Sequence, residues 1–210
     1  MRILLLCFLT LYLIQSSYQE TIKLPDPIKE GGMPLYEALN KRHTQRDFDP
    51  TKKVTPEIIS QALWSCYGIN RPDSKLRTVP SAKAWLSLKP YVFLEEGVYL
   101  YNPGDHSLTQ VLEGDYREYT GTQDFVKDAR IDFVFICDFK KKSAMDPDDE
   151  HKKRSMYLDT GHVTMSLYLF AATNGMKGVS RAMVDTAKLF ELLGLKEGDY
   201  YFTLAFSLGY

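Results

Sequence analysis

Metal-binding clusters are missing from this sequence. The chain has only three cysteines, Cys7, Cys66 and Cys137, and neither a Cys-x-x-Cys pair nor a His/Cys cluster is present. Structural metal sites use such clusters, so we expect no bound metal. Cys66 and Cys137 lie in apolar surroundings, which favours buried free thiols. A disulfide between them stays an alternative for an exported chain, although two cysteines do not make a disulfide scaffold.

A strong net charge is also missing. Lys and Arg number 26 against 27 Asp and Glu, a net charge of −1. This balance argues against a dedicated nucleic-acid-binding protein, because such proteins carry a clear positive excess. No internal repeat or low-complexity segment interrupts the chain, and its 210 residues suffice for one domain with a core, or two small ones.

No apolar run is long enough for a comfortable membrane span, which needs about 20 residues. Residues 3–14 are almost wholly apolar, follow a positive start at Arg2, and are followed by small and polar residues at 15–19. This order is typical of a secretory signal peptide. We therefore expect residues 1–17 to be removed and the protein to be secreted or otherwise exported, with no stable membrane span; an uncleaved anchor is the alternative.

The rest of the chain divides into an arm and one domain. Residues 18–33 are polar and rich in Pro and Gly, which predicts a linker or extended arm, and residues 34–210 form the domain. A short helix begins at Pro34. A second helix begins at Thr55-Pro56, a capping hydroxyl followed by proline, and ends at Gly68 before a loop over 68–72.

Later segments alternate between the patterns of strands and helices. Strands rich in aromatic and β-branched residues are predicted at 91–94, 97–101, about 108–112, 131–139 and 201–207. The strand at 131–139 is a largely apolar run, which indicates burial on both faces. Helices are predicted at 155–176 and 184–193, and the charged residues 146–154 as a solvated loop. Together these patterns indicate an α+β fold, with a mainly antiparallel sheet packed by helices.

Basic and hydroxyl side chains crowd into the stretch of residues 40–49. Arg42, His43, Thr44 and Arg46 can direct many hydrogen bonds to one point, and arginine's fork suits phosphate oxygens. A solvated basic turn is the alternative interpretation.

The pattern Arg-His-Thr-x-Arg-x-Phe-Asp at residues 42–49 resembles the opening signature of the nitroreductase family, whose members bind flavin mononucleotide (FMN). In that family the first arginine, the hydroxyl residue and the later basic residue hold the phosphate, ribityl chain and ring edge of the flavin. The resemblance therefore implies that Arg42, His43, Thr44 and Arg46 contact FMN.

Further matches extend the resemblance over residues 34–210. Trp-x-x-x-Gly-Ile-Asn-Arg at 64–71 resembles the end of a helix in one branch of the family. Gly-Val-Tyr-x-Tyr-x-Pro at 97–103 resembles a hairpin of the branch related to peptide-modifying cyclodehydratase-associated oxidases. Pro80, Ser81 and Ala82 match the loop that in the family crosses a dimer interface to the flavin ring, and Arg181 lies at the turn whose backbone approaches that ring. The resemblance therefore implies that these four residues also bind the cofactor, with Arg181 as a ring contact.

Taken as a family member, the chain is expected to be an intertwined homodimer with FMN at its interface. The implied activity is that of an FMN-dependent oxidoreductase that moves hydride through flavin N5, with NAD(P)H as a candidate electron donor and a small-molecule acceptor. Because the chemistry would be the cofactor's, no catalytic residue is assigned. For His162, in the long helix, a packed or interfacial role is favoured over a catalytic one.

A second hypothesis, from another functional class, is a flavin-binding or structural homodimer without turnover. Ala84 stands where the family often has asparagine, and Leu86 where glutamine is usual. The chain given ends at Tyr210, before the position where many family members carry further basic residues. The Arg42–Arg46 cluster and Ser81 favour the enzyme.

Overall fold

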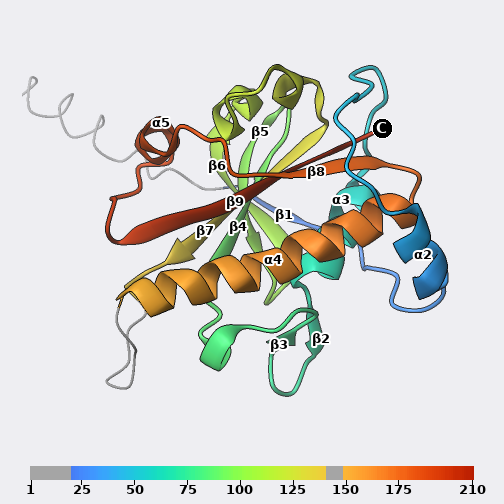
Figure 1. The fold of residues 1–210 in the computed structure, drawn as a ribbon, viewed down its shortest axis with the longest axis horizontal. Coiled ribbons are helices and arrows are strands. Elements are labelled where there is room, and N and C mark those ends of the chain that lie inside the picture. The colour runs from blue at the N-terminus through green and yellow to red at the C-terminus, as the bar shows by residue number, and fades with distance from the viewer. Residues whose placement is uncertain (1–19, 141–148) are drawn as a thin grey trace, which may run out of the picture.

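A seven-stranded antiparallel sheet is the centre of the computed structural model, which describes residues 20–140 and 149–210 (Figure 1). The strands lie in the order β1-β6-β5-β4-β7-β9-β8. The predicted α+β class with a mainly antiparallel sheet is confirmed. The predicted signal peptide, residues 1–17, lies outside the described residues. The strands of this sheet are β1 Thr21–Lys23, β4 Leu88–Phe93, β5 Gly97–Asn102, β6 Ser107–Glu113, β7 Ile131–Asp138, β8 Lys177–Arg181 and β9 Tyr200–Gly209.

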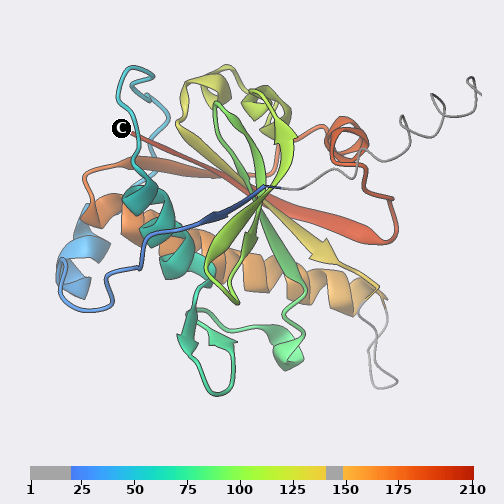
Figure 2. The ribbon, with the colours of Figure 1, turned by 180° about the vertical axis from the view of Figure 1, so that it is seen from behind.

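Helices cover both faces of the sheet. α3 and the long α4 share one hydrophobic core with the sheet, and α5 packs in a second core on the opposite face (Figures 1 and 2). Among the described helices, none is long and apolar enough to cross a bilayer. The α-helices are α2 Leu35–Lys41, α3 Pro56–Tyr67, α4 Asp149–Thr173 and α5 Thr186–Leu192, and the short 3-10 helices are η1 Ala82–Ala84, η2 Arg117–Thr120 and η3 Asp124–Asp128.

Helix α3 begins and ends where its capping residues predict. The Thr55 side chain accepts the N–H of Ile58, Pro56 occupies the first helical position, and Gly68 follows the last turn. Leu63 and Cys66 on its buried face are fully shielded from solvent.

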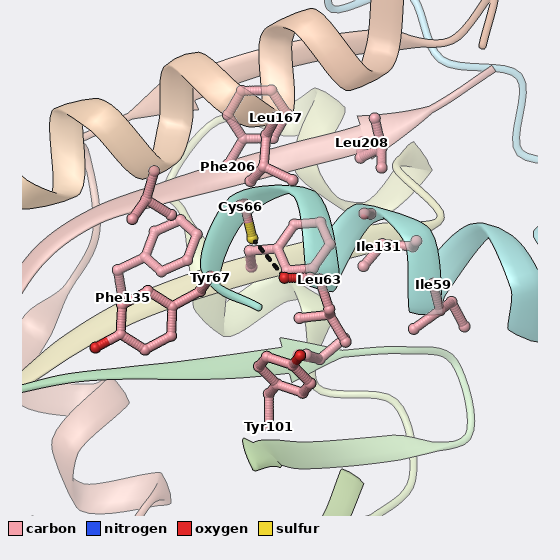
Figure 3. Close-up of a cluster of buried hydrophobic side chains, with 14 of the residues drawn as sticks. Ile59, Leu63, Cys66, Tyr67, Tyr101, Ile131, Phe135, Leu167, Phe206 and Leu208 are labelled. Atoms are coloured by element: carbon pink, nitrogen blue, oxygen red, sulfur yellow. Dashed lines mark hydrogen bonds between the residues drawn. The ribbon is translucent and has the colours of Figure 1, made fainter. Parts of the chain in front are cut away.

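Strand β7 lies at the centre of the sheet and is buried on both faces, as its apolar sequence predicts. Phe133 and Phe135 point into the core under α3 and α4, part of which Figure 3 shows, while Val134 and Ile136 point into the core under α5. Both described cysteines are buried and free, which confirms the favoured interpretation of the thiols.

Four segments differ from the predictions by more than shifts of a few residues at element ends, and one of them is strand β8, which was not predicted. Helix α4 begins at Asp149, so the solvated loop predicted for 146–154 is wrong from that residue onward. Acids in the first turn suit the helix dipole. Lys152 is 1% exposed and donates to the Phe139 carbonyl at 3.1 Å. Its charge led to the prediction of a solvated residue, although the side chain is buried. The loop predicted for 68–72 contains β2 Ile69–Arg71, paired with β3 Leu76–Arg77. Within the predicted arm, β1 pairs with β6.

Candidate functional site

The basic stretch after α2, residues 42–49, lies against β8, the strand at one edge of the sheet. Arg42 caps α2 in an extended conformation, and the N–H of Gln45 donates to the Gly178 carbonyl of β8 at 3.1 Å. Phe48 is 8% exposed and packs against Val179. One backbone hydrogen bond and one buried ring therefore fix the course of the stretch beside β8.

Tyr168 of α4 joins this stretch to the sheet. The Thr44 hydroxyl lies 3.1 Å from the Tyr168 hydroxyl, which also accepts the Ser180 N–H of β8 at 2.9 Å. The Arg42 guanidinium lies over the Tyr168 ring, 5.4 Å from its centroid, and Phe206 meets the ring edge-on. Three elements thus place a guanidinium, two hydroxyls and a backbone amide in one cluster.

The two arginines of the stretch keep their charges available. Within residues 20–140 and 149–210, neither Arg42 nor Arg46 has a carboxylate partner. The nearest acids in the sequence are engaged: Lys177 donates to Asp47 at 2.9 Å, which lowers the pKa of that carboxyl, and Asp49 accepts the N–H two residues further on. Arg42 is half-buried over Tyr168, and Arg46 is exposed, 5.9 Å from the centroid of the Phe125 ring. Guanidinium groups without a carboxylate partner are suited to bind an anion such as a phosphate.

His43 is exposed beside these arginines. Its Nδ1 lies 2.8 Å from the Lys41 carbonyl oxygen, which can only accept, so Nδ1 carries the hydrogen. The bond turns the imidazole back toward the end of α2. The structure therefore brings Arg42 and Thr44 together at Tyr168, places Arg46 over Phe125 of η3, and turns His43 toward its own backbone.

The Pro80–Ala82 loop is fixed to α4 by Asp159. Both carboxylate oxygens of Asp159 accept the N–H of Ala82, at 3.0 and 2.9 Å. The Ser81 hydroxyl accepts the Leu86 N–H at 3.1 Å, which closes the turn. Pro80 is exposed and Ser81 half-buried, so the tip of the loop faces outward.

The structure places the predicted flavin contacts in two groups on opposite sides of α4: Arg42 and Thr44 at Tyr168, and the Pro80–Ala82 loop at Asp159. Asp159 and Tyr168 are nine residues apart, which is about 13 Å along the helix axis and half a turn around it. In Figure 1, η1 accordingly lies on one side of α4 and β8 on the other. A single chain brings Arg42 and Thr44 to β8, but it does not bring the Pro80–Ala82 loop to them.

Arg181 differs from its predicted role as a ring contact. Its side chain is buried, donates to Asp132 at 2.8 Å, and makes further hydrogen bonds to Thr120. Burial raises the pKa of Asp132 to about 6, while Ser207 and Arg181 stabilise its charge. The guanidinium of Arg181 is thus engaged in a buried ion pair beneath the sheet and is not available to a ligand.

Sequence analysis did not identify Tyr168 or Asp159 as site residues. Each acts across a long sequence separation, 124 residues from Thr44 to Tyr168 and 77 from Ala82 to Asp159. The available signal was a polar side chain at each border of the apolar face of α4, and that signal does not identify a partner.

Comparison with known proteins defines the class to which this fold and site belong. The model of the nitroreductase family matches residues 39–210, so the chain belongs to the nitroreductase family and is an oxidoreductase. A nitroreductase-family protein of Methanocaldococcus jannaschii is 29% identical over 186 residues, which cover 84% of this chain and 90% of that protein.

Solved structures agree with this assignment. A nitroreductase-family protein of Ralstonia eutropha superimposes with a TM-score of 0.83 and 31% identity, covering 93% of this chain and 91% of that one. A more distant family structure, from Desulfovibrio desulfuricans in complex with FMN, has a TM-score of 0.59 and 16% identity over 86% of this chain and 87% of that one. At that identity the likeness concerns the fold alone.

Proposed function

We propose that this chain is an exported FMN-dependent oxidoreductase, with its flavin between the two subunits of a homodimer. The observation that carries the proposal is the cluster of Arg42, Thr44 and Tyr168, fixed to β8 by the Ser180 N–H. Arg42 and the nearby Arg46 offer charge and hydrogen-bond donors, and no acid within the described residues neutralises them.

The donor set suits the chemistry of FMN. Arg42 and Arg46 would hold the phosphate, because a planar guanidinium donates two parallel hydrogen bonds to its oxygens. Thr44, already hydrogen-bonded to Tyr168, would bind a hydroxyl of the ribityl chain. When bound, FMN supplies a ring that accepts and donates hydride at N5. The residues of this chain bind and orient it, and the FMN complex of the Desulfovibrio desulfuricans protein supports the choice of cofactor.

The dimer is proposed because one chain holds only half of the contacts. The Pro80–Ala82 loop lies across α4 from Arg42, so a second chain is needed to bring such a loop to the flavin. The surface between these two edges of α4 is apolar and uncovered, with Leu158 62% and Met165 38% exposed and His162 beside them. This surface is suited to burial against a partner.

Helix α2 extends the uncovered apolar surface. Its apolar side chains Leu35 and Leu39 are 60% and 43% exposed, and Tyr36 is 85% exposed. Because α2 packs against α4, these side chains continue the surface of the long helix. A contiguous apolar surface of this kind favours a permanent interface over a monomer in water.

Export is proposed from the first 17 residues, whose charged start and apolar run resemble a signal peptide. Sequencing the N-terminus of secreted material tests this part. A mature chain that begins near Tyr18 is expected, and soluble cytosolic protein that keeps Met1 would contradict export. Outside the cytosol NAD(P)H is scarce, so an electron donor other than NAD(P)H is compatible with the proposal.

A flavin-binding dimer without turnover is the second candidate. Ala84 and Leu86 occupy the places of two side chains that donate hydrogen bonds in the family, and neither aliphatic side chain can do so. Both have positive φ angles, 52° and 48°, so the loop also departs from an ordinary extended course there.

The absorbance spectrum of the purified protein separates the candidates. The enzyme should show flavin bands that bleach when NADPH or another donor is added without oxygen and return when an acceptor is supplied. Flavin bands that persist with every donor would favour the binding protein. A purified dimer that takes up no FMN even when FMN is added in excess would contradict both.

A further inference from the structure

Helix α4 carries one polar side chain on each of the two edges that border the proposed site. Tyr168 holds the Arg42–Thr44 half, and Asp159 holds the Pro80–Ala82 loop. The proposed function uses Tyr168 within a chain's own flavin contacts. It gives no role to Asp159, whose half-buried carboxylate accepts the Ala82 N–H and also interacts with the Ser81 hydroxyl.

The loop that Asp159 holds has an unusual backbone. Lys83, Ala84 and Leu86 have φ angles of 49°, 52° and 48°, the left-handed region that non-glycine residues seldom occupy. Such conformations persist only where surrounding contacts fix them. Within the loop, the Ala84 and Trp85 N–H groups donate to the Ser81 and Ala82 carbonyls, and the Leu86 N–H donates to the Ser81 hydroxyl. The Asp159 carboxylate on the Ala82 N–H is the contact that ties this turn to α4.

The chemistry of Asp159 suits a positioning role. Burial raises the pKa of this carboxyl, and the Ala82 N–H that it accepts acts in the opposite direction. A carboxylate is the strongest acceptor that a side chain offers to an N–H. The interaction therefore fixes both the height of the loop above α4 and the direction of its tip.

We propose that Asp159 is a positioning residue of the flavin site: its carboxylate holds the Pro80–Ala82 loop in the conformation that reaches the flavin of the other subunit. The effect on FMN binding rests on the proposed function, whereas the contact between Asp159 and the loop does not. Helix α4 then serves two sites at once, its own through Tyr168 and its partner's through Asp159.

The geometry is tested first on flavin-free protein by hydrogen exchange. The N–H of Ala82 in the full chain should exchange about tenfold or more faster in Asp159→Ala than in the wild type, because its acceptor is gone. Asp159→Asn keeps one acceptor oxygen and should fall between them. Glu150→Gln is the matched control, since it removes an exposed negative charge from the first turn of α4. Wild-type exchange in Asp159→Ala would overturn the proposal, and so would equal acceleration in the control.

The consequence is tested by FMN titration of the same variants. Asp159→Ala should weaken FMN binding by about tenfold and shift the absorbance bands of the bound flavin, with Asp159→Asn partly restored and Glu150→Gln unchanged. Wild-type binding and bands in Asp159→Ala, with its loop exchanging faster, would overturn the role in the site while leaving the flavin proposal intact. Wild-type protein without FMN affinity would instead contradict the proposed function, and the exchange result would still decide the geometry.

Discussion

Removing the guanidinium of Arg42 should weaken FMN binding through the phosphate. Arg42 has no carboxylate partner within the described residues and lies 5.4 Å from the Tyr168 ring centroid, so Arg42→Ala breaks no internal ion pair. A hydrogen bond to a charged group contributes about 1.5–3 kcal/mol. The dissociation constant of FMN should therefore rise about tenfold to hundredfold.

Riboflavin makes this prediction specific, because it has the same ring and ribityl chain but no phosphate. Fluorescence titration of Arg42→Ala should show the loss for FMN and nearly unchanged affinity for riboflavin. Arg42→Lys should fall between, since it keeps the charge and loses the planar fork. Arg154→Ala, at an exposed position on α4, is the control. Equal losses for both flavins, or none for FMN, would refute the phosphate role of Arg42.

Three further predictions concern the support of the site. Tyr168→Phe keeps the ring but leaves the Ser180 N–H without its acceptor, so calorimetry should show about 1–3 kcal/mol of lost stability, and titration should show weaker FMN binding; wild-type values for both would contradict the role of the hydroxyl. Asp132→Asn leaves the buried Arg181 charge unpaired, and urea unfolding should show a loss of about 3–5 kcal/mol, whereas a loss below about 1 kcal/mol would contradict that ion pair. Burial raises the pKa of the Cys137 thiol to about 12. The native protein should therefore stay unreactive to Ellman's reagent as the pH rises through about 8.5, where an exposed thiol ionises. A rapid reaction of the native protein would contradict the burial of Cys137.

Local signals in the sequence predicted most of the fold. The caps at Thr55 and Gly68 act within a few residues of the helix that they bound, and the apolar run of β7 reports directly on its burial. The start of α4 was not predicted, because Lys152 reads as solvated while its ammonium contacts the Phe139 carbonyl in the interior. A charge pattern alone does not show which charged residue is buried.

The candidate site was predictable only in its contiguous part. Arg42, Thr44 and Arg46 are close in the sequence, so their pattern could be recognised. The partner of Arg181 is 49 residues away at Asp132, and nothing near either residue in the chain indicates the pair. Only the three-dimensional structure shows that Arg181 is buried whereas Arg46 is exposed. The partners of Tyr168 and Asp159 likewise could be identified only from the structure.

The central claim, a flavin site shared between two subunits, is tested most directly with mixed dimers. One chain carries Arg42→Ala and Arg46→Ala, and the other carries Ser81→Trp, a bulky side chain that would keep the loop away from the flavin ring of a shared site. Each is first shown to bind little FMN as a homodimer. The two are then co-expressed with different tags, and dimers that carry both tags are isolated.

If the site is shared, each mixed dimer contains one intact site, formed by the arginines of the Ser81→Trp chain and the loop of the other chain. We predict about one bound FMN per mixed dimer, measured by flavin absorbance against protein concentration. If each site lies within one chain, every site in the mixed dimer is damaged. Mixed dimers as empty as their parents would therefore contradict the account.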